Sequence, residues 1–183
     1  DLDGGLGIPY GKDAPPLPDL YAEVVKREIG VLGCQLIFEP GRMLVGNAGI
    51  LVSRVLYVKK SAAKTFVIVD AAMNDLMRPT LYDAYHEILP VVESRAAPEP
   101  VDVVGPVCET GDIFAENRPL PLPKQGDLLA FRSAGAYGAS MAGTYNARLL
   151  VPEVLVKGGK FSVIRPRQTY EELIGRDTVP DWL

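Results

Sequence analysis

The chain has 183 residues, of which 48% are hydrophobic and 23% charged, so it can bury a sizeable core and is globular rather than disordered. Its net charge of −4 and the lack of a Lys/Arg run argue against a nucleic-acid partner, and its apolar runs are too short to span a membrane. Cys34 and Cys108 lie far apart in unlike contexts, so no disulfide framework or metal site is expected and a reducing cytoplasm is the predicted setting. Because the sequence begins at Asp1-Leu2-Asp3 without Met, we expect it to be part of a longer protein.

The first segments alternate between strand and helix patterns. Asp1–Tyr10 resembles a strand end that opens into a glycine-rich loop, where backbone amides can approach a phosphate. Cys34–Phe38 reads as a buried strand, with Cys34 in the core. Parallel α/β barrels carry their sites on loops that follow strands, so we interpret residues 1–45 as the last β/α units of a barrel.

A helix is predicted between these two strands. Asp19–Gly30 has Asp19 as a plausible N-cap and Gly30 as a stop signal. Its apolar residues Leu20, Val24 and Ile29 fall on roughly one face, which indicates an amphipathic helix.

The turn Glu39-Pro40-Gly41-Arg42 follows the second predicted strand directly. Its amides and one guanidinium converge on a single point beside a carboxylate, a combination that suits a phosphate and a cationic ring nitrogen. The alternative is a tight turn with a surface Glu–Arg pair.

From Gly46 onward the pattern becomes that of short strands separated by Pro and Gly clusters, as in a β-sandwich or barrel. We therefore interpret residues 46–183 as an all-β domain that ends in a short helix, Thr169–Ile174, with a capping box between Thr169 and Glu172. The predicted strands are Ile50–Val58, Thr65–Asp70, Glu87–Val92, Val101–Val107, Leu128–Phe131, Leu149–Val156 and Phe161–Ile164.

Five motifs occur in an order and at spacings that resemble the diaminopimelate decarboxylases, pyridoxal-phosphate (PLP) enzymes of the alanine-racemase-like class. They are Gly4-Gly5-Leu6-Gly7, Glu39-Pro40-Gly41-Arg42, Met77-Arg78-Pro79 with Leu81-Tyr82, Cys108-Glu109-Thr110-Gly111-Asp112 and Gly135-Ala136-Tyr137-Gly138-Ala139. The resemblance covers nearly the whole chain. It implies the C-terminal part of a PLP-binding (β/α)₈ barrel followed by a β-domain.

The resemblance also implies a cofactor site. Gly5 and the Pro40-Gly41-Arg42 turn would hold the PLP phosphate, and Glu39 would pair with the pyridine nitrogen, so that the ring accepts electrons. Tyr137, in a loop of small residues, would reach a phosphate oxygen and the substrate; the alternative is a tyrosine that anchors a flexible loop. Asp3 departs from the family pattern, because many relatives carry a third glycine there. A carboxylate at this position would repel the phosphate unless it points away.

Arg78 and Tyr82 are four residues apart and share a face if Pro79–Tyr85 is helical. A guanidinium and a phenol together suit a carboxylate, although a surface pair of little consequence is the alternative. The resemblance implies that they bind the distal carboxylate of diaminopimelate, with help from Arg42.

Cys108 is expected at the tip of the strand Val101–Val107, beside Glu109. A lone cysteine is commonly a buried structural residue, but a thiol beside an acid can deliver a proton. The resemblance casts Cys108 as the proton donor and Glu109 as a ligand of the substrate amine, both donated across a homodimer interface. His86, the only histidine, is interpreted as structural.

By this resemblance the parent enzyme would decarboxylate meso-2,6-diaminopimelate to L-lysine. The lysine that carries PLP as a Schiff base would precede Asp1, so the chain by itself is expected to be inactive. One alternative is a sister decarboxylase that acts on carboxynorspermidine, ornithine or arginine, although Arg78 and Tyr82 disfavour the amine substrates. Another is a non-catalytic β-domain that serves oligomerisation.

Overall fold

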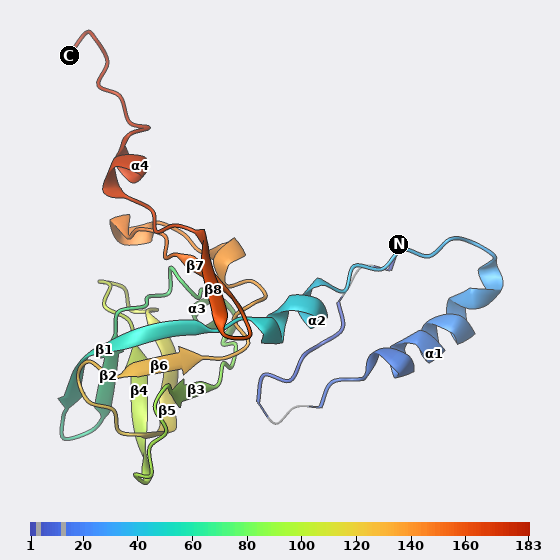
Figure 1. Cartoon of the computed structure of the whole chain (residues 1–183), viewed down its shortest axis with the longest axis horizontal. Coiled ribbons are helices and arrows are strands. Elements are labelled where there is room, and N and C mark those ends of the chain that lie inside the picture. The colour runs from blue at the N-terminus through green and yellow to red at the C-terminus, as the bar shows by residue number, and fades with distance from the viewer. Residues whose placement is uncertain (3–4, 12–13) are drawn as a thin grey trace.

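A curled six-stranded sheet is the centre of the molecule (Figure 1). The computed structural model describes residues 1–2, 5–11 and 14–183, so Asp3 and Gly4 of the predicted glycine loop lie outside the described residues. The strand order is β3-β6-β1-β2-β4-β5, and a separate hairpin pairs β7 with β8. The strands are β1 Leu51–Lys60, β2 Thr65–Val69, β3 Ile88–Pro90, β4 Pro98–Val104, β5 Ile113–Pro121, β6 Leu128–Phe131, β7 Glu153–Lys157 and β8 Lys160–Arg165.

The sheet nearly closes into a barrel. Neighbouring strands are antiparallel except β2 and β4, which run parallel. The two edge strands approach each other through side chains rather than a ladder: Nη1 of Arg118 in β5 donates to the carbonyl of His86, just before β3, over 2.7 Å.

Alternation along the strands fills the interior of the sheet. In β1, Ser53 and Val55 are buried whereas Val52 lies on the outer face, and a bulge follows Val55. The centre of the core is aromatic: the rings of Phe114 and Phe131 lie 4.8 Å apart. Buried aliphatic residues from each main strand surround them, which is the main stabilising contribution to the domain. They are Val55, Val67, Val69, Val101, Val103, Leu120 and Leu129.

Every strand predicted after Gly46 has a counterpart, but only β6 agrees with its prediction at both ends, and one strand was not predicted. β4 ends at Val104, three residues before the predicted end. β5 was missed because its sequence contains Asn117 and two prolines, Pro119 and Pro121. Prolines are tolerated there because β5 is an edge strand.

The helices are short and sit outside the sheet. They are α1 Pro18–Ile29, α2 Gly41–Val45, α3 Arg78–Tyr82 and α4 Tyr170–Ile174, with 3₁₀ turns at Gly30–Leu32, Gly46–Ala48, Ala139–Met141 and Tyr145–Ala147. The predicted capping box of α4 is confirmed, since the Thr169 hydroxyl accepts from the Glu172 amide and the Glu172 carboxylate accepts from the Thr169 amide. None of the helices in the described part of the chain has the length and apolar character to cross a membrane.

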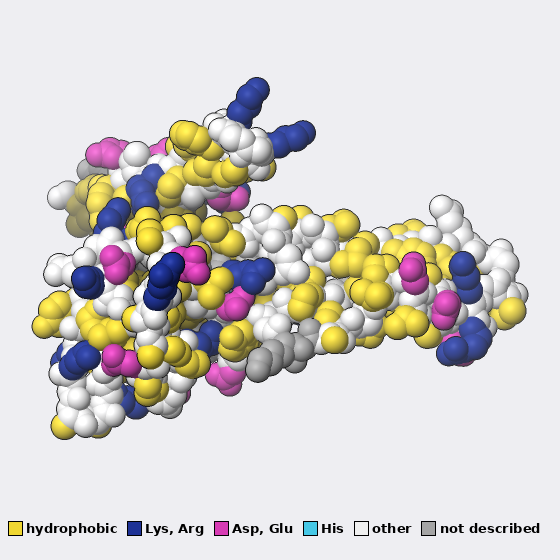
Figure 2. Space-filling model, turned by 60° about the horizontal axis from the view of Figure 1, so that its bottom comes forward, with side chains coloured by type: hydrophobic (Ala, Val, Ile, Leu, Met, Phe, Trp, Pro, Cys, Tyr) yellow, Lys and Arg dark blue, Asp and Glu magenta, His cyan; other side chains and the backbone are white. Residues whose placement is uncertain are grey.

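Helix α1 confirms the predicted helix but not its details. The N-cap is Leu17, with Pro18 at the first helical position, so the prediction of Asp19 as N-cap is wrong; Gly30 is the C-cap, as predicted. The expected apolar face is not buried, because α1 extends away from the sheet and Leu20 and Val24 remain exposed (Figures 1 and 2).

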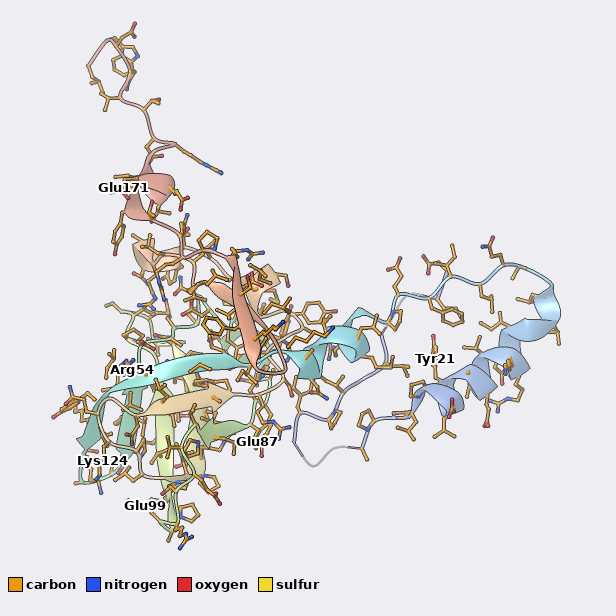
Figure 3. The ribbon with its side chains drawn as sticks, in the orientation of Figure 1. Tyr21, Arg54, Glu87, Glu99, Lys124 and Glu171 are labelled. Carbon is orange, nitrogen blue, oxygen red and sulfur yellow. The ribbon has the colours of Figure 1, made fainter. Side chains whose placement is uncertain are left out.

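The predicted buried strand Cys34–Phe38 is absent. Only a single parallel bridge joins Phe38 to Leu2, and Cys34 is exposed rather than in the core. Tyr21 of α1 points toward this returning segment and packs edge-on against Phe38, with ring centroids 6.1 Å apart (Figure 3). A central parallel strand needs ladder partners and a covering layer, and the described residues supply only Leu2 on one side.

Leu129 tests the sheet core. Its side chain is fully buried, so Leu129→Ala should lower the free energy of unfolding by about 2–5 kcal/mol, measured by urea denaturation of the chain. Leu89→Ala, on the outer face of neighbouring β3, is the matched control and should cost much less. Equal losses would contradict the assigned interior of the sheet.

Asp102 of β4 gives the stability a pH dependence. Burial alone would raise the pKa of this carboxyl, but hydrogen bonds from Lys64 Nζ (2.6 Å) and the Asn117 amide (2.7 Å) hold its pKa below the ordinary 3.8. Its stabilisation is therefore present above pH 3.8 and lost as the pH falls through the lower, folded-state value.

Asp102→Asn should consequently reduce the free energy of unfolding at neutral pH by about 1–3 kcal/mol. The gap between variant and unmodified chain should narrow as the solution is acidified below pH 3.8, when the carboxyl becomes protonated. Chemical denaturation at a series of pH values measures this difference in the free energy of unfolding. A difference that does not change with pH would show that the charge of Asp102 does not stabilise the fold.

Candidate functional site

Two loops that were predicted to bind a phosphate emerge side by side. The Leu2 amide donates to the Ile37 carbonyl over 2.9 Å, and Leu2 and Phe38 form a parallel bridge. Because the bridge is parallel, the chain runs in the same direction at Leu2 and at Phe38. This is the relation that loops at the C-terminal end of parallel strands have to each other.

The turn Glu39-Pro40-Gly41-Arg42 leads straight into α2. The Gly41 amide donates to the Glu39 carbonyl over 2.9 Å, and the Leu44 amide donates to the Pro40 carbonyl over 3.3 Å. A Cβ atom added at Gly5 or Gly41 would meet nothing within 4 Å, so a ligand can approach the backbone at both places. Open backbone, a guanidinium and a nearby carboxylate fit the phosphate and ring nitrogen of PLP.

The Tyr137 loop is packed against α2. The Ala134 amide donates to Gly49 over 2.9 Å and the Gly135 amide donates to Gly46 over 3.0 Å. Position 135 requires glycine, because a Cβ there would collide with the Val45 carbonyl. This close packing brings the half-exposed Tyr137 ring to 5.4 Å from the Arg42 guanidinium, and Tyr137 itself has a φ of +62°.

A second arginine lies close to the first. We call Tyr10, Arg42, Arg78, His86 and Tyr137 the arginine cluster. The guanidinium carbon of Arg78 lies 4.6 Å from the centroid of the Tyr10 ring, and that of Arg42 lies 6.0 Å from the same ring. Two cations thus share one aromatic ring, which favours binding of an anion between or beside them.

Arg78 is 7% exposed although it is a charged residue. Its Nη1 donates to Nε2 of the buried His86 over 3.0 Å, which requires the neutral tautomer whose Nδ1 donates to the Arg132 carbonyl over 2.8 Å. Burial lowers the pKa of His86, and the neighbouring Arg78 and Arg118 lower it further, against the bond to Arg132. Among the described residues, no acid forms an ion pair with Arg78.

Tyr82 stands at the opposite end of α3 from Arg78. It is 63% exposed and makes no hydrogen bond within the described part of the chain. The predicted helical turn is confirmed, but it ends at Tyr82 and not at Tyr85, because Asp83 takes a left-handed conformation. The two residues are therefore on one short helix, and no side-chain hydrogen bond joins them among the described contacts.

Cys108 and Glu109 lie in an exposed turn rather than at a strand tip, because β4 already ends at Val104. Glu109 accepts from the Gly111 amide over 3.2 Å and from the Tyr145 hydroxyl over 2.9 Å. Both bonds lower the pKa of Glu109, and the bond from Gly111 has the larger effect. The bond to Glu109 in turn raises the pKa of Tyr145. Glu109 is thus held ionised beside an exposed thiol.

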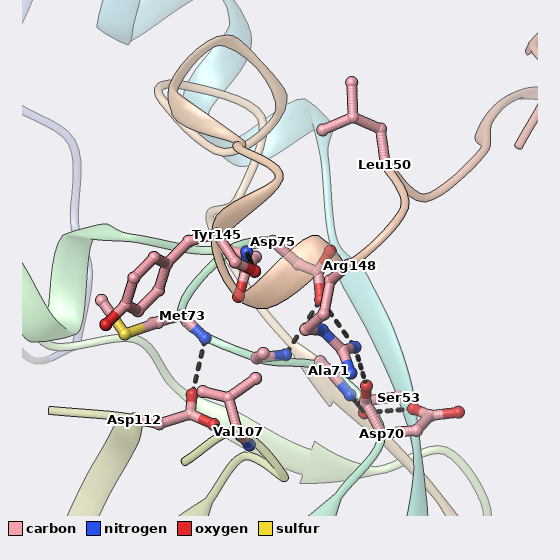
Figure 4. A network of polar contacts seen from close by, with 12 residues as sticks. Ser53, Asp70, Ala71, Met73, Asp75, Val107, Asp112, Tyr145, Arg148 and Leu150 are labelled. Carbon is pink, nitrogen blue, oxygen red and sulfur yellow. Dashed lines mark hydrogen bonds and ion pairs between the residues drawn. The ribbon is translucent and has the colours of Figure 1, made fainter. Parts of the chain in front are cut away.

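Asp112 holds this turn in place. Its buried carboxylate accepts from the Met73 amide over 2.6 Å and from the Val107 amide over 2.9 Å (Figure 4). The hydroxyl of Thr80, on α3, donates to the Gly111 carbonyl over 2.7 Å. The turn with Cys108 is consequently attached to the helix that carries Arg78.

The structure brings together Arg42, Arg78 and Tyr137, but it keeps Cys108 and Glu109 in a separate group. Within the described ranges, no hydrogen bond or ion pair joins the two groups. The sequence analysis missed Tyr10 and Tyr145. The position of Tyr10 directly after the glycine-rich loop was a usable signal, whereas nothing local distinguishes Tyr145.

The lysines that the structure describes lie in α1, at the end of β1, in turns and in the β7–β8 hairpin. None belongs to the segments that carry Glu39, Arg42 or Tyr137. The described residues therefore fit the phosphate and ring of PLP but offer no lysine for its aldehyde in these segments. Nor do they contain a group of three or more His, Cys, Asp or Glu side chains that could hold a metal ion.

Known proteins match this chain over most of its length. Residues 16–135 match the family model described as "Pyridoxal-dependent decarboxylase, C-terminal sheet domain". The diaminopimelate decarboxylase of Zymomonas mobilis is 55% identical over 100% of this chain and 44% of that protein. The chain thus spans less than half the length of such relatives.

Solved structures agree. Diaminopimelate decarboxylase from Helicobacter pylori, complexed with L-lysine, superposes with a TM-score of 0.87 at 41% identity over 94% of this chain and 42% of that one. The enzyme from M. jannaschii, also with L-lysine, has a TM-score of 0.90 at 39% identity over 98% and 42%. With the family model matched across the sheet and the turn before it, the chain belongs to the pyridoxal-dependent decarboxylase family, of which it carries the C-terminal sheet domain.

Proposed function

We propose that the chain forms the C-terminal part of a diaminopimelate decarboxylase, which removes CO₂ from meso-2,6-diaminopimelate to leave L-lysine. The names and high identity of the relatives support this reaction. In this proposal residues 1–45 complete a PLP-binding barrel and residues 46–183 form the β-domain. The departure of the N-terminal segment from the sheet supports that division (Figure 1).

The observation that carries the proposal is the charge of Arg78, which forms no ion pair with an acid among the described residues. Burying a guanidinium without an acid is unfavourable, and here its nearest described partners are a neutral imidazole and an aromatic ring. A carboxylate bound at this point would complete the ion pair. Arg78, with Arg42 and Tyr82, would hold the distal carboxylate, the one that the reaction leaves in place.

The cofactor would lie where the two predicted loops emerge together. Gly5, Pro40, Gly41 and Arg42 would hold the PLP phosphate with Tyr137, and Glu39 would accept a hydrogen bond from the pyridinium N–H and keep the ring protonated. PLP, when bound, accepts the electron pair released as CO₂ leaves. The lysine that binds its aldehyde would come from a segment that this chain does not contain.

Cys108 and Glu109 would serve the site of a partner chain. Glu109, kept ionised by Tyr145 and Gly111, can accept a hydrogen bond from the substrate ammonium. The exposed Cys108 thiol can return a proton to the substrate carbon. The exposure of both residues supports a homodimer with shared sites, which we place in the cytoplasm because both described cysteines are free thiols.

The amine substrates and a non-catalytic module fit less well. Amine substrates such as ornithine would require an acid at the distal end, where this chain has Arg78. The solved lysine/ornithine decarboxylase of Vibrio vulnificus is 22% identical to this chain and shares its fold. A non-catalytic sheet module would not need a buried arginine whose described neighbours include no acid partner.

Arg78→Ala tests the substrate assignment in the complete enzyme. Loss of a charge-assisted contact to the carboxylate should lower kcat/KM for diaminopimelate by about 100-fold, mainly through KM. Arg54→Ala, an exposed arginine on β1, is the matched control and should change little (Figure 3). An unchanged kcat/KM in the Arg78 variant would rule out this binding role.

Cys108→Ala tests the proton donor. It should reduce kcat by about 10²–10⁴-fold while PLP binding, followed by its absorbance, stays as before. Cys34→Ala is the control, because Cys34 is also exposed and free. If both variants retain full kcat, Cys108 has no part in proton transfer.

Mixing the two impaired variants tests the shared site. In a hybrid of Arg78→Ala and Cys108→Ala chains, one of the two sites would receive an intact Arg78 and an intact Cys108. Random reassembly should therefore restore about a quarter of the normal activity. No recovery, with mixed dimers verified by mass, would contradict sharing across the interface.

A further inference from the structure

We propose that His86 and Tyr10 are positioning residues that fix the Arg78 guanidinium for the distal carboxylate. This inference rests on the proposed function, because it assigns a task to residues around the same substrate site. Neither residue needs to touch the substrate. Their effect would pass entirely through Arg78.

His86 is built to accept a hydrogen bond from Arg78. Its Nδ1–H donates to the Arg132 carbonyl over 2.8 Å, which leaves Nε2 as the acceptor for Arg78 Nη1 at 3.0 Å. The backbone of His86 is held from β5, where Arg118 donates to its carbonyl over 2.7 Å. A series of hydrogen bonds thus runs from β5 through His86 to the guanidinium.

The neutral state of His86 is essential to this arrangement. A protonated ring would present an N–H to a cation and lose the bond to Arg78. Burial, together with the nearby Arg78 and Arg118, lowers the pKa of His86, so the accepting form persists at neutral pH. An acid in the same position would neutralise Arg78 and compete with the substrate carboxylate, whereas a neutral acceptor orients the cation and leaves its charge available.

Tyr10 supplies the other support. Its ring lies under Arg78 at 4.6 Å and meets the His86 ring edge-on, with centroids 5.4 Å apart and planes at 76°. The hydroxyl of Tyr10 is buried and has no hydrogen-bond partner among the described residues. The contacts that the structure gives the Tyr10 side chain are thus made by its ring.

Together the two residues limit the freedom of a long side chain. An arginine loses considerable rotamer entropy when it is fixed, and the loss is smaller on binding if the side chain is already held. A preset Arg78 would increase the affinity for substrates that carry the distal carboxylate. It would not change the affinity for molecules that lack one.

A pair of substitutions at His86 separates the acceptor from the rest of the ring. His86→Asn retains a donor for the Arg132 carbonyl but loses the acceptor for Arg78, whereas His86→Gln can place an oxygen near the Nε2 position. In the complete, PLP-loaded enzyme we expect His86→Asn to raise KM for diaminopimelate about tenfold with a smaller effect on kcat, and His86→Gln to recover most of the loss.

Inhibition by L-lysine and by cadaverine separates a loss of carboxylate binding from a general disruption of the active site. L-lysine keeps the distal carboxylate, and cadaverine lacks any carboxylate. His86→Asn should weaken inhibition by L-lysine about tenfold and leave inhibition by cadaverine unchanged. Equal weakening of both inhibitors, or of neither, would overturn the proposal.

A double-mutant cycle with Arg78→Ala distinguishes the two levels of inference. If His86 acts through Arg78, His86→Asn should add little to KM in the Arg78→Ala background; additive effects would overturn the positioning role. If Arg78→Ala itself leaves KM unchanged, the proposed function fails instead.

Two substitutions at Tyr10 test the proposal independently if His86→Asn does not fold. Tyr10→Phe preserves the ring and should retain KM within about twofold, whereas Tyr10→Leu should raise it about fivefold or more. Circular dichroism verifies that both variants are folded. If the folded Tyr10→Phe and Tyr10→Leu variants have equal KM values, the Tyr10 ring does not position Arg78, and the proposal is overturned.

Discussion

The buried carboxylate of Asp112 fixes the loop before α3, the helix of Arg78, relative to the turn that carries Cys108. It accepts from the Met73 amide, just before α3, and from the Val107 amide, just before Cys108. Two short bonds to one buried charge define the spacing of these loops more strictly than exposed contacts can. Thr80 adds a further tie to Gly111, so the helix of Arg78 and the turn of Cys108 form one rigid unit.

The arginine cluster shows how a fold can keep a charge available for a ligand. Arg78 is buried, yet its described neighbours, Tyr10 and His86, provide a π face and a lone pair instead of a negative charge. This environment holds the cation without neutralising it. Its cost must be offset by the close-packed sheet nearby, and a bound carboxylate would relieve it.

The N-terminal segment lacks the buried strand that its sequence pattern predicts. Cys34–Phe38 has the composition of a buried strand, but it makes one bridge, to Leu2, and stays mostly exposed. A parallel strand is stabilised by neighbours on both sides, which are distant in sequence. The same reason applies to α1, whose apolar residues Leu20 and Val24 find no surface in this chain to cover.

The sequence by itself determined the strands of the sheet other than β5, the α4 capping box and the motifs that resemble the decarboxylases. Each depends on alternation, a local cap or a short run of residues, which are properties of neighbours along the chain. Only the tertiary structure decided that Tyr10, Arg78 and His86 meet, that Tyr145 reaches Glu109 and that the Pro-containing β5 forms an edge. Those contacts join residues far apart in sequence and follow from burial and sheet closure, which no local pattern encodes.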